Sequence, residues 1–248
     1  NFRINRYLAK CGYGSRREVE DIVREGRVKV NGKVVTDFSV RVFTSDVVEM
    51  DGKEIRPIEH FRYIVLNKPA GYTVTSRAFP NEKYIYELLP EDLHSLRYAG
   101  RLDRDSRGLL ILTDDGDFLQ KITHPGYRTT KRYLVTVDQI PEDPYWQTDF
   151  YSGIPDGDDL LRVLRVSIVD QNKRLIEIVL GQGKNRHIRR MFEAKGSHVT
   201  DLQRVAIGKL EISELNVPEG SYTEIEPFWL EKGKKDSILG NFNPWKEP

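Results

Sequence analysis

Residues 99–112 read Ala99-Gly-Arg-Leu-Asp-Arg-Asp-Ser-Arg-Gly-Leu-Leu-Ile-Leu112, a cluster of charges that runs directly into an apolar stretch. Five charged side chains lie between Gly100 and Gly108, and the four apolar residues that follow are typical of a buried strand. Charges at the end of a core strand can point into a cleft. This segment therefore predicts a functional site at the end of a buried strand.

The same charges allow two other interpretations. A solvated turn would carry them in surface ion pairs that contribute little stability. A metal site would use Asp103 and Asp105, with Asp114-Asp115 nearby, as oxygen ligands in a metal-dependent phosphotransferase. The three interleaved arginines would repel a divalent cation, so we expect no metal ion here.

Apolar and alternating segments on both sides of this stretch predict a sheet. Strands are expected at residues 61–67, 109–113, 131–137, 161–169, 174–180 and 199–212, the fourth and fifth of them as a hairpin. One helix is expected at residues 185–195, closed by Gly196. Many strands with few, scattered helices favour an α+β fold with a largely antiparallel sheet.

The first 58 residues have a different pattern and predict a separate small module. Apolar residues at helical spacing predict two short helices, and Ser15 is the expected cap of the second, with Glu18 in the capping-box position. Alternating residues around Asn31-Gly32 predict a hairpin, because this pair suits the left-handed angles of a tight turn. Residues 1–33 carry nine basic and four acidic side chains, a local charge of +5.

Length and composition define the organisation and exclude several classes of protein. With 248 residues, we expect a module at residues 1–58, a linker around residues 51–59, a main domain at residues 59–232 and a tail at residues 233–248. The net charge of +1 excludes a uniformly basic coat, although it allows the local basic patch. The single cysteine, Cys11, excludes an intrachain disulfide framework.

The sequence also predicts where the chain resides. No stretch approaches the ~20 apolar residues that a membrane helix needs. The first residues, Asn1-Phe-Arg-Ile, lack the apolar core of a secretion signal. The chain is therefore expected to be soluble and cytoplasmic, without a membrane partner.

Basic residues crowd the start of the expected helix at residues 185–195. Lys184, Arg186, Arg189 and Arg190 lie where the helix dipole is already positive, so they oppose the helix unless an anion lies nearby. A carboxylate or a phosphate would resolve this conflict, and so would long side chains that reach solvent. His187 lies among them, but no second histidine has the spacing of a metal site.

Tyr133 lies in the strand expected at residues 131–137, directly after two basic residues. A tyrosine in such a strand usually packs in the core with its hydroxyl hydrogen-bonded. Beside a basic cleft, its ring can instead stack on a nucleic-acid base. The residue alone does not decide between these two roles.

Together these segments resemble the signature of bacterial ribosomal-RNA pseudouridine synthases, the small-subunit synthase A family and its large-subunit relatives. The family pattern is Gly-Arg-Leu-Asp, two variable residues, Ser or Thr, one more residue and Gly-Leu-Leu, which residues 100–110 match. Further motifs occur in the family's order: Asn67-Lys-Pro-x-Gly71, Lys131-x-Tyr133-x-Val135 and Gly183-Lys-Asn-Arg-x-Ile-Arg-Arg-Met-Phe192. Residues 1–58 resemble the S4-like RNA-binding domain of many members. His187 departs from the pattern, because the family often has glutamine there.

The resemblance implies a fold and the roles of individual residues. The fold is a small S4-like domain of two helices and a hairpin, then a mixed, mostly antiparallel sheet in two halves with a central cleft. Asp103 takes the position of the essential catalytic aspartate, and Tyr133 that of the tyrosine that stacks on the target base. Arg189, or as second choice Arg186, takes that of the arginine that pairs with the aspartate. Other cations are expected to bind RNA: Arg101, Lys184, Arg186, Arg190, Arg6, Arg16, Arg17 and Lys29.

The implied reaction isomerises a uridine of ribosomal RNA, 16S or 23S, to pseudouridine in a flipped-out nucleotide. It is redox-neutral, so the resemblance implies no small-molecule cofactor and no metal ion. It leaves open whether Asp103 attacks C1′, attacks C6 or assists loss of the C2′ proton. The enzyme is expected to act as a monomer. The alternative is a non-catalytic RNA-binding protein on the same scaffold, which the intact Asp103, Tyr133 and Arg189 argue against.

Overall fold

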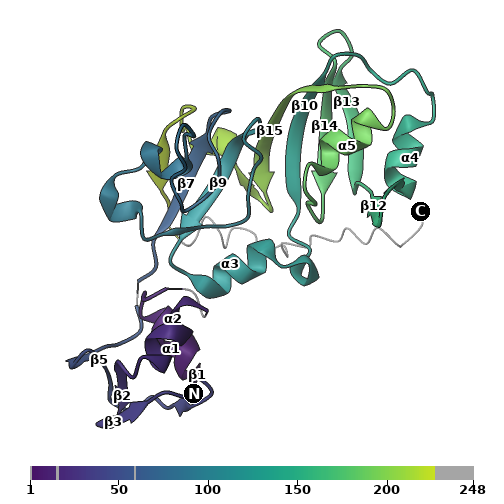
Figure 1. Cartoon of the computed structure of the whole chain (residues 1–248). Helices are drawn as coiled ribbons and strands as arrows, with labels where there is room; N and C mark the ends of the chain where they lie inside the picture. Colours follow the sequence, from purple (N-terminus) through teal and green to yellow (C-terminus); the bar gives the residue numbers. More distant parts are fainter. Residues whose placement is uncertain (1, 15–16, 59, 227–248) are drawn as a thin grey trace. The chain divides into compact units, whose positions relative to one another are not determined.

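The computed structural model of the chain describes residues 2–14, 17–58 and 60–226. Contacts divide the chain into two compact units, residues 1–62 with 114–118 and residues 63–113 with 119–248 (Figure 1). Each unit has its own hydrophobic core. The tail predicted at residues 233–248 lies outside the described residues.

The N-terminal unit contains the two predicted helices and a small sheet. The helices are α1 (Ile4–Lys10) and α2 (Glu18–Arg24), and their apolar faces bury Ile4, Leu8, Val19 and Val23 completely. Strands β2 (Val28–Val30), β3 (Lys33–Val35), β5 (Val48–Met50) and β6 (Lys53–Glu54) form a sheet in the order β3-β2-β5-β6. A separate short pair joins β1 (Phe2–Arg3) to β4 (Arg41–Val42).

Two tight turns shape this sheet. Asn31 and Gly32 have φ angles of 50° and 76°, which confirms the predicted hairpin between β2 and β3. Asp51 and Gly52, with φ angles of 49° and 79°, make the same kind of turn between β5 and β6. The linker predicted at residues 51–59 is therefore wrong in its first half, because Asp-Gly is itself a hairpin signal.

The start of α2 also differs from the prediction. The helix begins at Glu18, with Arg17 at the N-cap and no side-chain cap hydrogen bond. Glu18 is thus the first residue of the helix, whereas the capping box needs it in third place. The expected cap, Ser15, lies outside the described residues.

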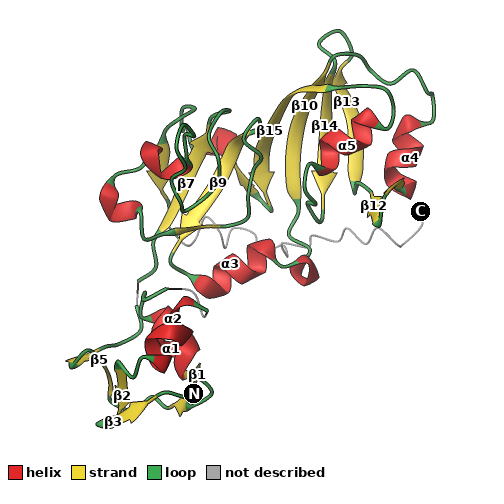
Figure 2. Cartoon of the chain, viewed as in Figure 1, coloured by secondary structure: helices red, strands yellow, loops and turns green. Residues whose placement is uncertain are grey.

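The second unit is built on one large sheet, with the path β13-β14-β10-β15-β9-β7-β17 (Figure 2). Its strands are β7 (Tyr63–Lys68), β8 (Arg97–Tyr98), β9 (Arg107–Thr113), β10 (Lys131–Val137), β13 (Arg165–Asp170), β14 (Leu175–Leu180), β15 (Val199–Ile207), β16 (Leu210–Glu211) and β17 (Tyr222–Glu224). Every pairing in it is antiparallel except that of β9 with β15. The predicted α+β fold with a mixed, mostly antiparallel sheet is confirmed.

The parallel junction divides the sheet into the two predicted halves. It consists of only two residue pairs, Gln203 with Arg107 and Arg204 with Gly108. A Cβ atom on Gly108 would lie 2.3 Å from the carbonyl oxygen of Arg204, and Gly108 has a φ of +107°. Only glycine fits this junction, since it has no Cβ and tolerates positive φ.

Helices cover one face of the half formed by β10, β13 and β14 (Figure 2). They are α4 (Trp146–Ser152) and α5 (His187–Glu193), and the rings of Trp146, Phe150 and Phe192 meet between them. The remaining elements are α3 (Gly116–Thr123), the two-stranded ribbon β11 (Ile154–Asp156) with β12 (Asp159–Leu161), and four short 3-10 helices. None of the helices in the described residues is long and apolar enough to cross a membrane.

Three predicted boundaries need correction. The strand expected from residue 161 begins at Arg165, because Leu161 belongs to the separate ribbon β12. The helix expected from residue 185 begins at His187, because Arg186 has a left-handed φ of 46°. The extended segment expected up to residue 212 ends at Ile207, where Gly208 turns the chain with a φ of 58°.

Candidate active site

A cavity of about 210 Å³ in the second unit brings together residues that are far apart in sequence. Its polar lining includes the charged side chains of Asp103, Arg101, Lys184 and Arg186, and its aromatic wall is Tyr133. Apolar side chains complete the walls: Leu102, Leu180, Ile188 and Leu202. Drug-sized ligands occupy roughly 300–1,000 Å³, so this cavity suits a single small ring.

Asp103 presents a free carboxylate to this cavity. It lies before β9, in a turn closed by a hydrogen bond of 3.0 Å from the Ser106 amide to the Asp103 carbonyl. The residue is half-buried, and none of the hydrogen bonds or ion pairs among the described residues engages its carboxylate. The group therefore remains available to a substrate.

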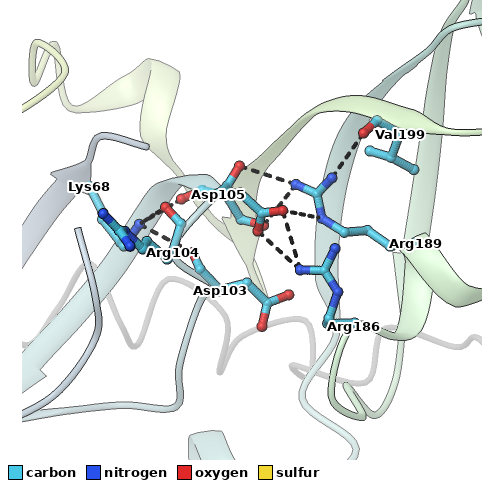
Figure 3. A network of polar contacts seen from close by, with 8 residues as sticks. Lys68, Asp103, Arg104, Asp105, Arg186, Arg189 and Val199 are labelled. Atoms are coloured by element: carbon cyan, nitrogen blue, oxygen red, sulfur yellow. Dashed lines mark hydrogen bonds and ion pairs between the residues drawn. The ribbon is translucent and has the colours of Figure 1, made fainter. Parts of the chain in front are cut away.

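Arg189 does not pair with Asp103, so that prediction is wrong. Its buried guanidinium instead forms an ion pair with Asp105, with 3.3 Å between Nε and Oδ2 (Figure 3). Nη1 donates to the Val199 carbonyl at 2.9 Å, and Nη2 donates to the Asp105 carbonyl at 3.1 Å. These backbone contacts fix the guanidinium at the turn, and Arg189 is not part of the cavity lining.

Arg186, the second choice as partner, also binds Asp105, with 3.2 Å between Nη1 and Oδ2. The carboxylates of Asp103 and Asp105 leave the turn in different directions, and only the second reaches the two arginines (Figure 3). Arg186 also lines the cavity that contains Asp103, whereas Arg189 does not. The cations at the start of α5 oppose the helix dipole, and a carboxylate, that of Asp105, offsets two of them. This is one of the alternatives that the sequence predicted.

Lys68 is the last residue of β7, lies close to the same turn (Figure 3) and is completely buried. Its Nζ donates to the carbonyls of Ser106 at 2.6 Å, Pro69 at 3.0 Å and Asp103 at 3.3 Å. Burial lowers the pKa of Lys68 to about 8, although Asp105 and Asp103 oppose the shift. The sequence placed Lys68 in a family motif but gave it no role, because nothing in its position shows which carbonyls it will meet.

The shifted pKa of Lys68 predicts how stability depends on pH. The pKa is about 8 in the folded chain and near its ordinary 10.5 in the unfolded chain. Between these values the unfolded chain binds more protons, so Lys68 makes the free energy of unfolding rise with pH. Compared with Lys68→Met, the wild-type chain should therefore gain stability from about pH 7 to about pH 10. Urea denaturation of both proteins measures the free energy of unfolding at each pH. A difference between the two proteins that does not change with pH would contradict the lowered pKa of Lys68.

Tyr133 reaches the cavity from β10 and is largely buried, with 8% of its surface exposed. In the sheet it lies opposite Ile178 of β14 and Arg204 of β15. The residue thus has both of the features weighed above, a place in the core and a ring at the wall of a charged cavity. A flat substrate ring in the cavity would meet the ring of Tyr133.

Two more of the predicted RNA-binding cations, like Arg186, have carboxylate partners. Lys184 Nζ lies 2.5 Å from Asp159 Oδ1, and Arg190 binds Asp156 at 2.9 Å and Asp159 at 3.0 Å. These pairs attach the start of α5 to the ribbon β11–β12, which gives both cations a structural role. Any contact of theirs with RNA remains a prediction and would compete with these ion pairs.

His187 differs from the charged residues around it. It is buried in the cavity wall, and burial together with the nearby Arg190 and Lys184 lowers its pKa to about 4. The imidazole is therefore neutral near pH 7. His187 therefore carries no positive charge for a phosphate. It does not add to the cationic rim of the cavity, which consists of Arg101, Lys184 and Arg186.

Three of the four cations predicted to bind RNA in the N-terminal unit are described, and they lie at its surface. Arg17 and Lys29 are exposed. Arg6 is also exposed but pairs with Asp117 at 3.0 Å within this unit. Arg16 lies outside the described residues.

The cavity as a whole suits an anionic substrate that carries a flat ring. It offers one free carboxylate, one aromatic wall and a cationic rim. Among the described residues, no group of three His, Cys, Asp or Glu side chains could hold a metal ion.

Comparisons with known proteins identify this arrangement. Residues 62–194 match the RNA pseudouridylate synthase family, and residues 2–48 match the S4 domain. The first match spans more than half of the chain and contains every residue of the cavity except Leu202. The chain therefore belongs to the RNA pseudouridylate synthase family and carries an N-terminal S4 domain.

Several relatives align over most of their length. The chain is 37% identical to an uncharacterized RNA pseudouridine synthase of Aquifex aeolicus (strain VF5), over 86% of this chain and 87% of the relative. It is 33% identical to the ribosomal large subunit pseudouridine synthase B of Bacillus subtilis (strain 168), over 91% and 92%. A dual-specificity RNA pseudouridine synthase, RluF of Salmonella typhi, is 34% identical over 90% and 75%.

A solved structure confirms the likeness in three dimensions. The crystal structure of a pseudouridylate synthase covers 94% of this chain and 99% of its own, with a TM-score of 0.67 and 29% identity. The fold predicted from the sequence motifs is therefore that of the family.

Proposed function

We propose that the chain isomerises a uridine of ribosomal RNA to pseudouridine in the cavity formed by Asp103 and Tyr133. The observation that carries this proposal is a carboxylate without a protein partner, next to an aromatic wall, in a member of the pseudouridylate synthase family. A paired carboxylate would be a structural group, whereas Asp103 is free to react. The same cavity argues against a non-catalytic RNA-binding protein, which has no need of a free carboxylate there.

The reaction balances without a cofactor. The N1–C1′ bond breaks and the uracil departs as an anion that keeps the bonding electron pair, and N1 later takes up a proton. The uracil turns, a C5–C1′ bond forms from the C5 electrons, and the C5 proton leaves. Asp103 is the group placed to attack C1′ or C6, or to take the C2′ proton, and the ring of Tyr133 holds the detached base.

The target nucleotide must leave its stem to reach the cavity. Flipping out a base costs a few kcal/mol, which stacking and phosphate contacts offset. Arg101 and Arg186 line the cavity and are exposed, so they are the cations we assign to the phosphates beside the flipped base. Arg17 and Lys29 of the S4 domain are assigned to more distant phosphates, as expected of an RNA-binding domain that tethers the substrate.

The choice between 16S and 23S RNA concerns features outside the cavity. The sequence signature leaves 16S and 23S RNA open, but the named relatives include a large-subunit synthase B and a dual-specificity synthase, which favours 23S RNA. We propose a cytoplasmic, monomeric enzyme. Chemical mapping of pseudouridine in 16S and 23S transcripts treated with the full chain tests the assignment. A new site confined to 16S RNA would overturn the large-subunit choice, and no site in either would overturn the function.

We propose two tasks for Tyr133: its ring holds the base, and its hydroxyl assists loss of the C5 proton. Replacement of this residue separates them. Tyr133→Leu removes the aromatic face and the hydroxyl, so we expect turnover to fall by about 10²–10⁴-fold, the range of general acid–base catalysis. Tyr133→Phe keeps the ring that holds the base, and we expect it to retain RNA binding while C5 proton loss becomes slow. Single-turnover rates and filter-binding affinities measure both. Equal turnover of Tyr133→Phe and wild type would restrict the role of this residue to stacking.

A further inference from the structure

Arg204 of β15 pairs with both of the strands that adjoin the site residues, β9 and β10. Its backbone lies opposite Gly108 of β9, which follows the Asp103 turn, and opposite Tyr133 of β10. It therefore lies at the junction of the two halves of the sheet. A change in its position would alter the separation of Asp103 and Tyr133.

The side chain of Arg204 holds the segment that carries Asp103 at both ends. Nε donates to the Leu109 carbonyl at 2.8 Å, and Nη1 donates to the Arg101 carbonyl at 3.3 Å. Arg101 precedes Asp103 and Leu109 follows the turn. Together with Lys68 and Arg189, which bind carbonyls inside the turn, Arg204 leaves this segment little freedom to move.

The environment of Arg204 is unfavourable for a residue that serves stability alone. Only 3% of its surface is exposed, and among the described residues no carboxylate lies within ion-pair distance of its guanidinium. Nη2 is buried without a hydrogen-bond partner in the described part of the chain. Desolvation lowers the pKa of the half-buried Lys131 to about 8, and the nearby charge of Arg204 adds to this shift. A buried, unpaired cation is costly, and such costs persist where function requires them.

We propose that Arg204 is a positioning residue of the isomerase: its guanidinium and its backbone together fix the distance between the Asp103 carboxylate and the Tyr133 ring. It touches neither substrate nor the cavity, so it acts through these two residues. The inference rests on the proposed function, in which both residues act on the flipped uridine. Because a misplacement of about 1 Å can cost 10²-fold in rate, loss of this anchor should lower kcat far more than it changes KM.

Two variants and a matched control test this role. Arg204→Met keeps the length of the side chain but removes all donors, and Arg204→Lys keeps the charge but can reach only one carbonyl. The control is Arg132→Met, on the neighbouring strand β10, because Arg132 binds Glu177 and Glu211 and not the Asp103 segment. We expect Arg204→Met to lose about 100-fold in kcat with KM within about threefold. We expect Arg204→Lys to recover part of that loss and the control to retain its kcat.

The outcomes separate this inference from the proposed function. If folded Arg204→Met keeps kcat within about threefold of wild type while Asp103→Asn is inactive, the positioning role is overturned and the function stands. If Asp103→Asn remains active, the function itself fails. Should Arg204→Met not fold, Arg204→Lys decides: wild-type kcat in that variant, or its failure to fold, would show a purely structural residue and overturn the proposal.

Discussion

Asp103→Asn should abolish pseudouridine formation while leaving RNA binding intact. The substitution keeps the size of the side chain and removes its charge, and none of the hydrogen bonds between described residues depends on that carboxylate. The fold should therefore be unchanged. Loss of a reacting group of this kind reduces turnover by about 10⁴-fold or more. Single-turnover conversion of a ribosomal RNA transcript measures the rate, and filter binding measures the affinity.

Asp105→Asn is the matched control, since Asp105 lies two residues away on the same turn. Its carboxylate binds Arg186 and Arg189, so it supports the site without a free oxygen for the substrate. We expect a loss of about tenfold or less, in keeping with a half-exposed ion pair. A larger loss of activity in Asp105→Asn than in Asp103→Asn would show that the reacting carboxylate is Asp105 and not Asp103. If both substitutions lowered activity equally and a chelator abolished the activity of the wild-type chain, the metal-dependent phosphotransferase would be favoured.

Gly108→Ala should cause the largest loss of stability among single substitutions near the site. The new Cβ would lie 2.3 Å from the Arg204 carbonyl oxygen and 2.9 Å from the Arg204 amide nitrogen, both backbone atoms. Neither can move without breaking the parallel junction of β9 and β15. Overpacking and the strain of a φ of +107° together predict a loss of more than about 3 kcal/mol.

Gly116→Ala provides the contrast in a helix. Gly116 begins α3, and a Cβ there would meet nothing within 4 Å. Alanine in a helix restricts the unfolded chain more than glycine does, so we expect a gain of about 0.4–1 kcal/mol. Urea denaturation of both variants measures the two free energies of unfolding. A loss below about 1 kcal/mol in Gly108→Ala would show that the sheet junction yields and does not constrain the site.

The sequence was sufficient to predict many of the elements, and it selected two residues that lie on one cavity. The Asn31-Gly32 turn, the strand at residues 131–137 and the mixed sheet all follow from short-range patterns that the structure reproduces. Asp103 and Tyr133 came from a motif resemblance, and the structure places both on one cavity. Their catalytic roles remain predictions that the substitutions above test.

The contacts that hold the site residues in place could not be predicted from the sequence in the same way. The family resemblance implied that Arg189 binds Asp103, but only the three-dimensional turn decides that Asp105 faces it. Lys68 and Arg204 bind backbone carbonyls, and any residue can supply a carbonyl, so their partners leave no mark in the sequence. The contacts that hold a catalytic turn are therefore harder to predict than the turn itself.

Release of tritium from RNA labelled at C5 of uridine reports the isomerisation itself, because that hydrogen leaves when C5 becomes bonded to C1′. The full chain and its Asp103→Asn variant would each be incubated with 16S RNA, 23S RNA and the two ribosomal subunits. We predict that the wild-type chain releases tritium in proportion to the pseudouridine formed at a mapped position, and that the variant releases none above background. Release by the variant at the wild-type rate, or no release by the wild-type chain from any of these substrates, would contradict the account.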